Sequence, residues 1–480
     1  MFYFRNRGIV TPPEYRAQTK SPFIPQHVNP LVQRFAVLVL PILLRIRLRN
    51  WLPAGIAKVE VNNTEILVTL YEQFQQGKIR LIFAFRHSEV DDPLSLLYLF
   101  TRSLPKAAHK LGISLKYPFY THFIYDQGMT IWAGKWLGWL FSRLGGIAIQ
   151  RGRQLDRQAI RAARDLLING KMPLIIAPEG ATNGHSEVVS PLEPGTAQLG
   201  VWCLEDLQKH NCSEEVLIIP IGIQYHYANP PWLKLDLLLS QMEVDCGLPV
   251  QRIGKSASEK HNDIFYQRLL GLGKYLIIQM EGLYHKHYNC DFPDAQLGDN
   301  TAEVLVSRLQ YLLNEALNLC EQYFHIQTKG NIIDRCRRIE EVGWSHIYCQ
   351  DTNEIKSPLN QGITDWIAHE SAIRMRHMRL VESLVAVNAN YIQEKPSIER
   401  FAEISLIIFD IIARIKGIKV PCRPRLGWRN SQVTIGKPIS VTKSWLNYQQ
   451  NSGDNYRRAT KEVVNDITAK LKIALEEMIT

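Results

Sequence analysis

The feature that constrains the fold most is an alternation of short apolar runs with amphipathic segments between about residues 60 and 250. The apolar runs are short enough to predict buried strands, and they lie at residues 80–85, 146–150, 174–177 and 216–225. Segments with helical spacing stand between them, at 155–168 and 195–207. Strands and helices that alternate in this way predict an α/β domain with a central, mostly β-sheet layer flanked by helices.

The pattern changes after residue 251, where long helical segments dominate at 303–323, 363–391 and 398–416. Near the end, residues 433–441 (VTIGKPISV) predict a strand that can join the sheet, followed by a helix at 456–478. We therefore expect three regions. They are a basic N-terminal segment (1–60), the α/β domain (61–250) and a mainly helical C-terminal region (251–480).

Positive charge is concentrated at the N-terminus. The net charge is +10, and residues 1–60 hold nine Lys/Arg against two Glu. The apolar run 35–44 (FAVLVLPILL) leads directly into Arg45, Arg47 and Arg49. Ten apolar residues are too few to span a bilayer, which takes about 20. The pattern favours an interfacial or re-entrant membrane helix, with arginines at phosphate level, over a nucleic-acid-binding segment. A buried core helix is the alternative.

Two further features bear on location. Trp132, Trp136 and Trp139 follow helical spacing, which predicts one helix face that carries all three, either at a membrane interface or as a core stripe. The eight cysteines form no C-x-x-C pair, which favours reduced thiols on the cytosolic side. Together with the N-terminal segment, these features predict a membrane-associated protein on the cytoplasmic face.

One stretch, F-R-H-S-E-V-D-D-P, follows the first apolar run and carries candidate chemistry. His87 leaves the end of a predicted strand, and Asp92 caps a predicted helix with Pro93 at its first position. A tight turn can bring the two side chains together. The carboxylate would then bind one imidazole nitrogen and leave the other as a general base.

Two other interpretations of the stretch are open. A metal site would use His87, Glu89 and either Asp91 or Asp92, but no H-E-x-x-H motif or second ligand pair stands nearby. A polar turn with no chemical role is the third. Motifs later in the sequence distinguish between these three interpretations.

Three later elements follow in order. The strand G-I-A-I-Q, which begins at Gly146, is followed by Arg151, a cation suited to a phosphate. Glu179 and Gly180 follow the strand LIIA, where a carboxylate can orient a hydroxyl. Pro220 interrupts a buried strand, where proline is awkward, so it either lines a site or marks an edge strand.

The order and spacing of H-x-x-x-x-D, G-I-x-I-x-R, P-E-G and V-x-I-I-P-I resemble the glycerolipid acyltransferase family over roughly residues 60–250. Its best-known members are the lysophosphatidic acid (1-acylglycerol-3-phosphate) acyltransferases. The resemblance implies a membrane-associated enzyme whose partners are membrane lipids and whose acyl donor is acyl-CoA or acyl-carrier-protein. It implies no cofactor and no metal.

The resemblance also implies roles for single residues. His87 would take the proton from the acceptor hydroxyl, and Asp92 would orient the imidazole. The hydroxyl would attack the thioester directly, which agrees with the absence of a G-x-S-x-G nucleophile motif. The other implied residues bind substrate: Gly146 and Arg151 the acceptor phosphate, Glu179 and Gly180 the acceptor loop, and Pro220 the acyl site.

One departure concerns the acceptor. The family's third element usually continues P-E-G-T-R-S with a phosphate-binding arginine, whereas here Thr182 stands at that place. The resemblance implies transfer to 1-acylglycerol-3-phosphate, giving phosphatidic acid. The neutral Thr182 weakens the case for such a bare phosphomonoester, so another lysophospholipid or a neutral lipid alcohol is the alternative acceptor. A lipid-binding scaffold and a metallohydrolase are more distant alternatives. The sequence indicates neither the oligomeric state nor the acyl-chain preference.

Overall fold

The structure is a computed structural model that describes residues 17–19, 23–47, 55–150, 156–293, 302–349, 357–384, 390–418, 422–451 and 456–479. Its described residues form two compact units. The sheet unit takes in the described parts of 23–228 and 428–480. The helical unit takes in the described parts of 229–427 together with residues 17–19.

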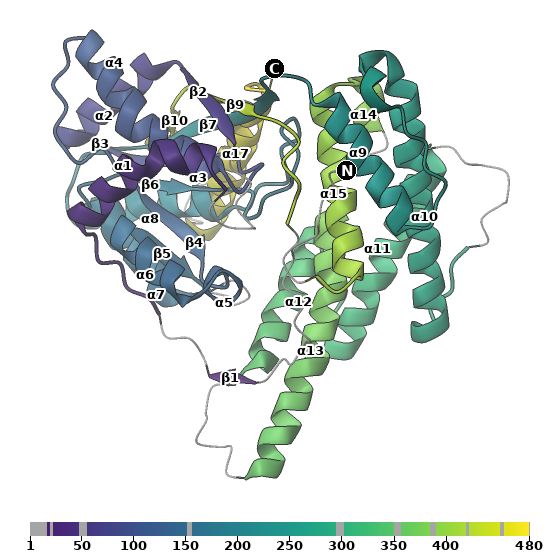
Figure 1. The fold of residues 1–480 in the computed structure, drawn as a ribbon. Helices are drawn as coiled ribbons and strands as arrows, with labels where there is room; N and C mark the ends of the chain where they lie inside the picture. The colour runs from purple at the N-terminus through teal and green to yellow at the C-terminus, as the bar shows by residue number, and fades with distance from the viewer. Residues whose placement is uncertain are drawn as a thin grey trace. The chain divides into compact units, whose positions relative to one another are not determined.

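One sheet organises the sheet unit, and in the described residues it has eight strands (Figure 1). They are β2 (Ile56–Asn62), β3 (Ile79–Phe85), β4 (His122–Asp126), β5 (Gly146–Ile149), β6 (Leu174–Ile176), β7 (Glu215–Tyr227), β9 (Arg429–Ile435) and β10 (Ile439–Ser440). Their order is β2-β9-β7-β3-β6-β4-β5, with β10 also paired to β7. Neighbouring strands from β7 to β5 are parallel, whereas β9 and β10 run antiparallel to β7.

Helices cover both faces of this sheet, because alternate residues of its buried strands point to opposite sides. Leu81 and Phe83 join one apolar cluster, and Ile82 and Ala84 join the other. The first cluster includes residues of α1 (Pro30–Arg45), α2 (Thr64–Gln75), α3 (Asp92–Tyr98), the π-helical turn Leu99–Ser103 and α4 (Leu104–Lys110). The second includes residues of α7 (Arg157–Asn169), α8 (Gly195–Lys209), α16 (Val441–Asn451) and α17 (Tyr456–Glu476). This is the mixed α/β architecture that the alternation predicted.

Pro220 lies in an interior strand, so an edge strand does not explain it. Its carbonyl accepts the Gly436 N–H at 2.9 Å, on the side of β7 where the partner changes from β10 to β9. N–H and C=O of one strand residue point to the same side. The missing N–H of Pro220 therefore falls in the gap between β10 and β9 and leaves the pairing with β3 intact.

The helical unit is built from long helices, as the patterns beyond residue 251 predicted. They are α9 (Trp232–Asp245), α10 (Asn262–Tyr288), α11 (Ala302–Phe324), α12 (Ile332–Ile347), α13 (Pro358–Leu384), α14 (Asn390–Glu394) and α15 (Ile398–Ile415), with two 3₁₀ turns at Gly254–Ser256 and Glu259–His261. A short parallel pair, β1 (Gln18–Thr19) and β8 (Tyr348–Cys349), also belongs to this unit. A buried Arg268 bonds Asp236 at 2.6 Å and Glu243 at 2.7 Å, which ties α10 to α9.

The prediction of one helix face with three tryptophans is wrong. Helix α5 (Met129–Trp132) ends at Trp132, and α6 (Lys135–Leu144) begins after Gly134, whose φ of +106° interrupts the helix. Trp136 and Trp139 remain on α6, and both are exposed. None of the described helices combines the length and the apolar character that a bilayer-crossing segment needs.

Candidate active site

His87 and Asp92 lie at the carboxyl end of β3. The strand ends at Phe85, and α3 begins at Asp92 with Asp91 as its N-cap, one residue earlier than the sequence predicted. Nδ1 of His87 lies 2.9 Å from Oδ2 of Asp92. The Asp92 side chain is fully buried, whereas that of His87 is 21 % exposed. The turn therefore brings the predicted pair together, with the histidine accessible and the aspartate enclosed.

Three donors meet the Asp92 carboxylate. Oδ2 accepts from the Glu89 N–H at 3.0 Å as well as from His87, and Oδ1 accepts from the Tyr225 hydroxyl at 2.7 Å. An ionised carboxylate can only accept, so Nδ1 of His87 must carry a proton. In the neutral imidazole the lone pair then resides on Nε2. That nitrogen accepts no hydrogen bond from any residue that the structure describes.

Glu179 supports His87 through the backbone. Its Oε1 accepts the His87 N–H at 2.8 Å, and its Oε2 accepts the Ser190 N–H at 2.9 Å. Burial raises the pKa of Glu179, although these two N–H groups and the charge of Arg86 favour the carboxylate. Both carboxylate oxygens of Glu179 are thus hydrogen-bonded within the chain, so Glu179 connects the loop that contains His87 to the loop that contains Ser190.

A buried arginine joins the same two loops. Arg86 is fully enclosed and donates to the carbonyls of His185 at 2.8 Å and Val188 at 2.9 Å. The Gly184 N–H donates to the Ser88 carbonyl at 3.1 Å. The loop that follows β6 is therefore fastened to the His87 loop by side-chain and backbone bonds, and both lie at the carboxyl ends of adjacent parallel strands, where α/β sheets bind ligands.

Gly180 and Thr182 differ in how much space surrounds each of them in that loop. Gly180 has φ +73°, and a Cβ at this position would collide with the Glu193 carboxylate. Thr182 is exposed, so a larger side chain can be accommodated there. Asn183 bonds the Val188 carbonyl at 2.7 Å and helps to hold the loop in this shape.

Gly146 begins β5, which pairs with β4, and no hydrogen bond in the described part of the chain joins it to His87. A Cβ on Gly146 would lie 2.8 Å from the Phe123 ring and 3.0 Å from the Phe141 carbonyl oxygen, so close packing explains the glycine. Arg151 lies outside the described residues, and its phosphate contact stays a prediction. Pro220 is buried in β7 and pairs with Ala84, one residue before the end of β3.

Sequence reasoning missed two residues of this site. Tyr225, near the end of β7, donates to Asp92, and Arg429, the first residue of β9, pairs with Asp91 at 2.7 Å and Glu89 at 3.3 Å. Neither residue belongs to a recognisable motif. The only available signal for Arg429 was its place just before a predicted strand.

The acids around His87 are not arranged as metal ligands. Glu89 and Asp91 face the Arg429 guanidinium. Among the described residues, no three His, Cys, Asp or Glu side chains are grouped as a metal ion would require. The pair of His87 and Asp92 is therefore suited to proton transfer by an imidazole that a carboxylate orients.

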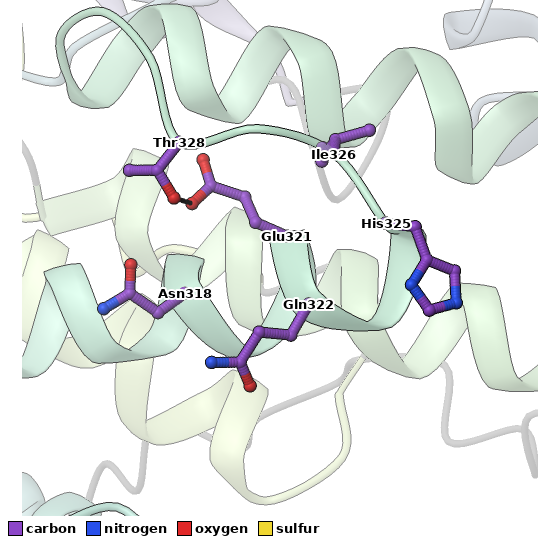
Figure 2. Close-up of a pocket in the computed structure, with 6 residues that line it drawn as sticks. All are labelled: Asn318, Glu321, Gln322, His325, Ile326 and Thr328. Carbon is purple, nitrogen blue, oxygen red and sulfur yellow. Dashed lines mark hydrogen bonds between the residues drawn. The ribbon is translucent and has the colours of Figure 1, made fainter.

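A pocket of about 330 Å³ lies in the helical unit and has different chemistry. Its lining, shown in Figure 2, consists of Asn318, Glu321, Gln322, His325, Ile326 and Thr328. Glu321 is already bound, because the Thr328 hydroxyl donates to it at 2.7 Å and Arg335 pairs with it at 2.8 Å. The carboxylate of this pocket is therefore already engaged by neighbours within the chain.

Comparison with known proteins gives one match. The model of the family described as Acyltransferase matches residues 58–224, which include β2 through most of β7 and both His87 and Asp92. No curated protein matches the chain. The matched region covers the H-x-x-x-x-D turn, the P-E-G turn and the strand that contains Pro220. Residues 58–224 of this chain are therefore similar to the Acyltransferase family.

Proposed function

We infer that this acyltransferase moves an acyl chain from a thioester, acyl-carrier-protein or acyl-CoA, to the free hydroxyl of a lysoglycerolipid. The observation that carries the proposal is the His87–Asp92 pair, in which a buried carboxylate holds Nδ1 and leaves Nε2 available. Such a pair can remove a proton from an alcohol near neutral pH. No cofactor is needed for this transfer.

The reaction balances with His87 as its only proton carrier. Nε2 takes the proton of the acceptor hydroxyl as the oxygen attacks the thioester carbonyl carbon. The tetrahedral intermediate collapses, the C–S bond breaks, and the leaving thiolate takes the proton from Nε2. Asp92 stabilises the imidazolium between these steps. The ester and the free thiol leave the enzyme in its starting state.

The acceptor that we propose is 1-acylglycerol-3-phosphate, which gives phosphatidic acid. Arg151 would bind the phosphate, and Glu179 and Gly180 would belong to the acceptor loop. Thr182 supplies no charge where the family usually has an arginine, and this favours a second candidate, a lysophospholipid with a substituted headgroup. A neutral lipid alcohol is a third.

We further propose that the protein works at the cytoplasmic face of a membrane. Helix α1 supports this, because Leu31, Phe35, Leu38 and Ile42 follow helical spacing and are between 50 and 72 % exposed. A row of exposed large apolar side chains on one helix face is typical of interfacial helices. Seven cysteines in the described residues are free thiols, which agrees with a reducing compartment.

One assay tests the proposal. Purified full-length protein is given labelled acyl-CoA or acyl-carrier-protein with a panel of lysolipids in mixed vesicles, beside His87→Ala and the exposed control His210→Ala. We expect acyl transfer to at least one lysolipid, unaffected by chelators, and a loss of roughly 10²- to 10⁴-fold in kcat for His87→Ala alone.

Other outcomes would contradict parts of the proposal. Full turnover by His87→Ala would exclude His87 as the base. Absence of turnover with every donor and acceptor, alongside retained lysolipid binding, would replace the enzyme by a lipid-binding scaffold. Loss of turnover on chelation, reversed by added metal, would favour the metallohydrolase class.

A further inference from the structure

Two residues outside the matched region complete the surroundings of Asp92. Tyr225 is 3 % exposed, and its hydroxyl donates to Oδ1 of Asp92 at 2.7 Å. The Arg429 guanidinium lies over the Tyr225 ring, 4.6 Å from the ring centre. Such a cation–π contact fixes the ring plane and hence the direction of the hydroxyl. Arg429, Tyr225, Asp92 and His87 thus form a continuous chain of contacts.

Arg429 also neutralises two of the three acidic side chains that follow His87. Glu89, Asp91 and Asp92 stand within four residues, all are buried, and like charges in a low-dielectric site repel. Arg429 pairs with Glu89 and Asp91 and leaves Asp92 to its three neutral or imidazole donors. Burial opposes the charge of Arg429, but Glu89 and Asp91 outweigh it and raise the pKa of the guanidinium.

Tyr225 remains a donor throughout the working pH range. Burial, and then the charges of Asp92 and Asp91, raise the pKa of its hydroxyl well above the ordinary value. With Oδ1 bound to this hydroxyl and Oδ2 to the Glu89 N–H, the Asp92 carboxylate has no freedom to turn away from His87.

We propose that Tyr225 is a positioning residue for the His87–Asp92 pair, and that Arg429 holds Tyr225 in place and neutralises the two neighbouring acids. The proposal rests on the acyltransferase function given above. Tyr225 acts by fixing the Asp92 carboxylate, which in turn keeps the His87 proton on Nδ1. Strand β9 is therefore part of the active site, although it lies far beyond residue 224.

The first test compares two buried tyrosines in full-length protein. Tyr225→Phe keeps the ring and the cation–π contact but removes the donor to Asp92. Tyr71→Phe is the matched control, because Tyr71 is equally buried and its hydroxyl bonds the carbonyls of Pro118 and Tyr120. The measurements are kcat, KM for both substrates, and the pH dependence of kcat/KM.

For Tyr225→Phe we expect kcat to fall by about tenfold and both KM values to stay unchanged. The fall is smaller than the roughly 10²- to 10⁴-fold that a general base contributes, because Tyr225 only positions the pair. Without the Tyr225 donor, more of the Asp92 charge acts on the imidazolium. The acid limb of the profile should therefore move to higher pH. Tyr71→Phe should keep the wild-type kcat and profile. If the two variants behave alike, Tyr225 is only a packing residue.

Arg429 has its own conservative pair of variants. Arg429→Lys keeps a positive charge near Glu89 and Asp91, whereas Arg429→Gln removes it. We expect the lysine to recover at least several-fold more kcat than the glutamine, at a pH where both proteins are folded by circular dichroism. Equal activity of the two folded variants would overturn the charge-neutralising role.

A measurement without substrate separates this proposal from the acyltransferase function. In protein labelled with ¹⁵N-histidine, the ring signals of His87 are identified by their loss in His87→Ala. We expect them to report a proton on Nδ1 in the wild type and a shifted tautomer balance in Tyr225→Phe. Unchanged signals in Tyr225→Phe would reject the positioning role, even if no acyl acceptor has been found.

Discussion

Nδ1 of His87 and Oδ2 of Asp92 lie 2.9 Å apart, and the Glu89 N–H and the Tyr225 hydroxyl also donate hydrogen bonds to that carboxylate. An amide cannot replace a carboxylate in such surroundings, because its NH₂ group would face a donor on at least one side. The geometry therefore demands an acid at position 92, not merely a polar side chain.

Asp92→Asn tests this demand. The amide favours the tautomer of His87 with its proton on Nε2, which abolishes the base. We expect kcat to fall by roughly 10²- to 10⁴-fold, measured with the donor and acceptor pair established for the wild type. Asp206→Asn is the control, since Asp206 pairs with Arg164 and is remote from the pair in the sequence and in its contacts. A fall of less than twofold in Asp92→Asn would contradict the pair.

A pair of glycines tests the shape of the acceptor loop. Gly180→Ala places a side chain at φ +73° and against Glu193, so we expect a loss of about 1 to 3 kcal/mol in the free energy of unfolding. Gly195→Ala, at the start of α8, meets no atom within 4 Å and should be neutral. Urea unfolding followed by fluorescence measures both. Equal stability would show that the loop relaxes freely.

Thr182→Arg tests the acceptor headgroup. If the acceptor's phosphate lies beside this loop, the new cation should lower KM for 1-acylglycerol-3-phosphate by about five- to tenfold, with little effect on a lysophospholipid whose phosphate is substituted. Thr182→Gln has a long side chain without charge and serves as the control. The gain should shrink at high salt. An identical change for both acceptors would place the headgroup elsewhere.

The exposed face of α1 can be tested apart from catalysis. Replacing Leu31, Phe35 and Leu38 by serine together removes most of its apolar surface, so we expect the protein to be released from anionic vesicles in a sedimentation assay. Leu446→Ser/Ile473→Ser removes two similarly exposed apolar side chains of the same unit that stand on different helices. That control should stay bound. Release of both variants, or of neither, would argue against α1 as the contact.

His377 predicts how the helical unit responds to acid. It is buried, its Nδ1 and the Tyr284 hydroxyl share a hydrogen bond at 2.6 Å, and burial, with Arg374 and Arg376, lowers its pKa from 6.5 to about 4. The stabilising contribution of the neutral ring is therefore complete above pH 6.5 and is lost as the pH falls toward 4.

Between pH 6.5 and pH 5 this loss amounts to about 2 kcal/mol. His377→Gln, which keeps an acceptor for Tyr284, should lack that part of the pH dependence. Hydrogen exchange of the α13 amides at the two pH values measures the difference in the unit that holds the histidine. Parallel curves for wild type and variant would show that His377 does not titrate in this way.

The parts of the site that could be predicted are local in sequence. His87 and Asp92 are five residues apart, so a strand end followed by a helix start was enough to bring them together. The strands around Leu81, Leu174 and Ile218 were visible because their apolar runs are short and end at polar or turn-forming residues. Helix starts were predicted to within two residues at Asp92, Arg157 and Ala302, whereas the helix expected from residue 363 begins at Pro358.

The parts that could not be predicted depend on distant pairing. Arg429 meets Asp91 across 338 residues, and only the insertion of β9 into the sheet makes that contact. Helical spacing of the tryptophans was misleading because one glycine, Gly134, interrupts the helix between them. Spacing reports which residues can share a face, but it does not report whether the backbone stays helical.

The position of β9 between β2 and β7 has a consequence for the nascent chain. A ribosome that adds about 5 to 20 residues per second needs roughly 15 to 70 s to travel the 338 residues from Asp91 to Arg429. Throughout that time Glu89 and Asp91 lack their cation, and once β7 has been made it lacks its pairing with β9 until Arg429–Ile435 follow. The contacts of Arg429 with Glu89 and Asp91 can therefore form only after the first residue of β9 has been translated.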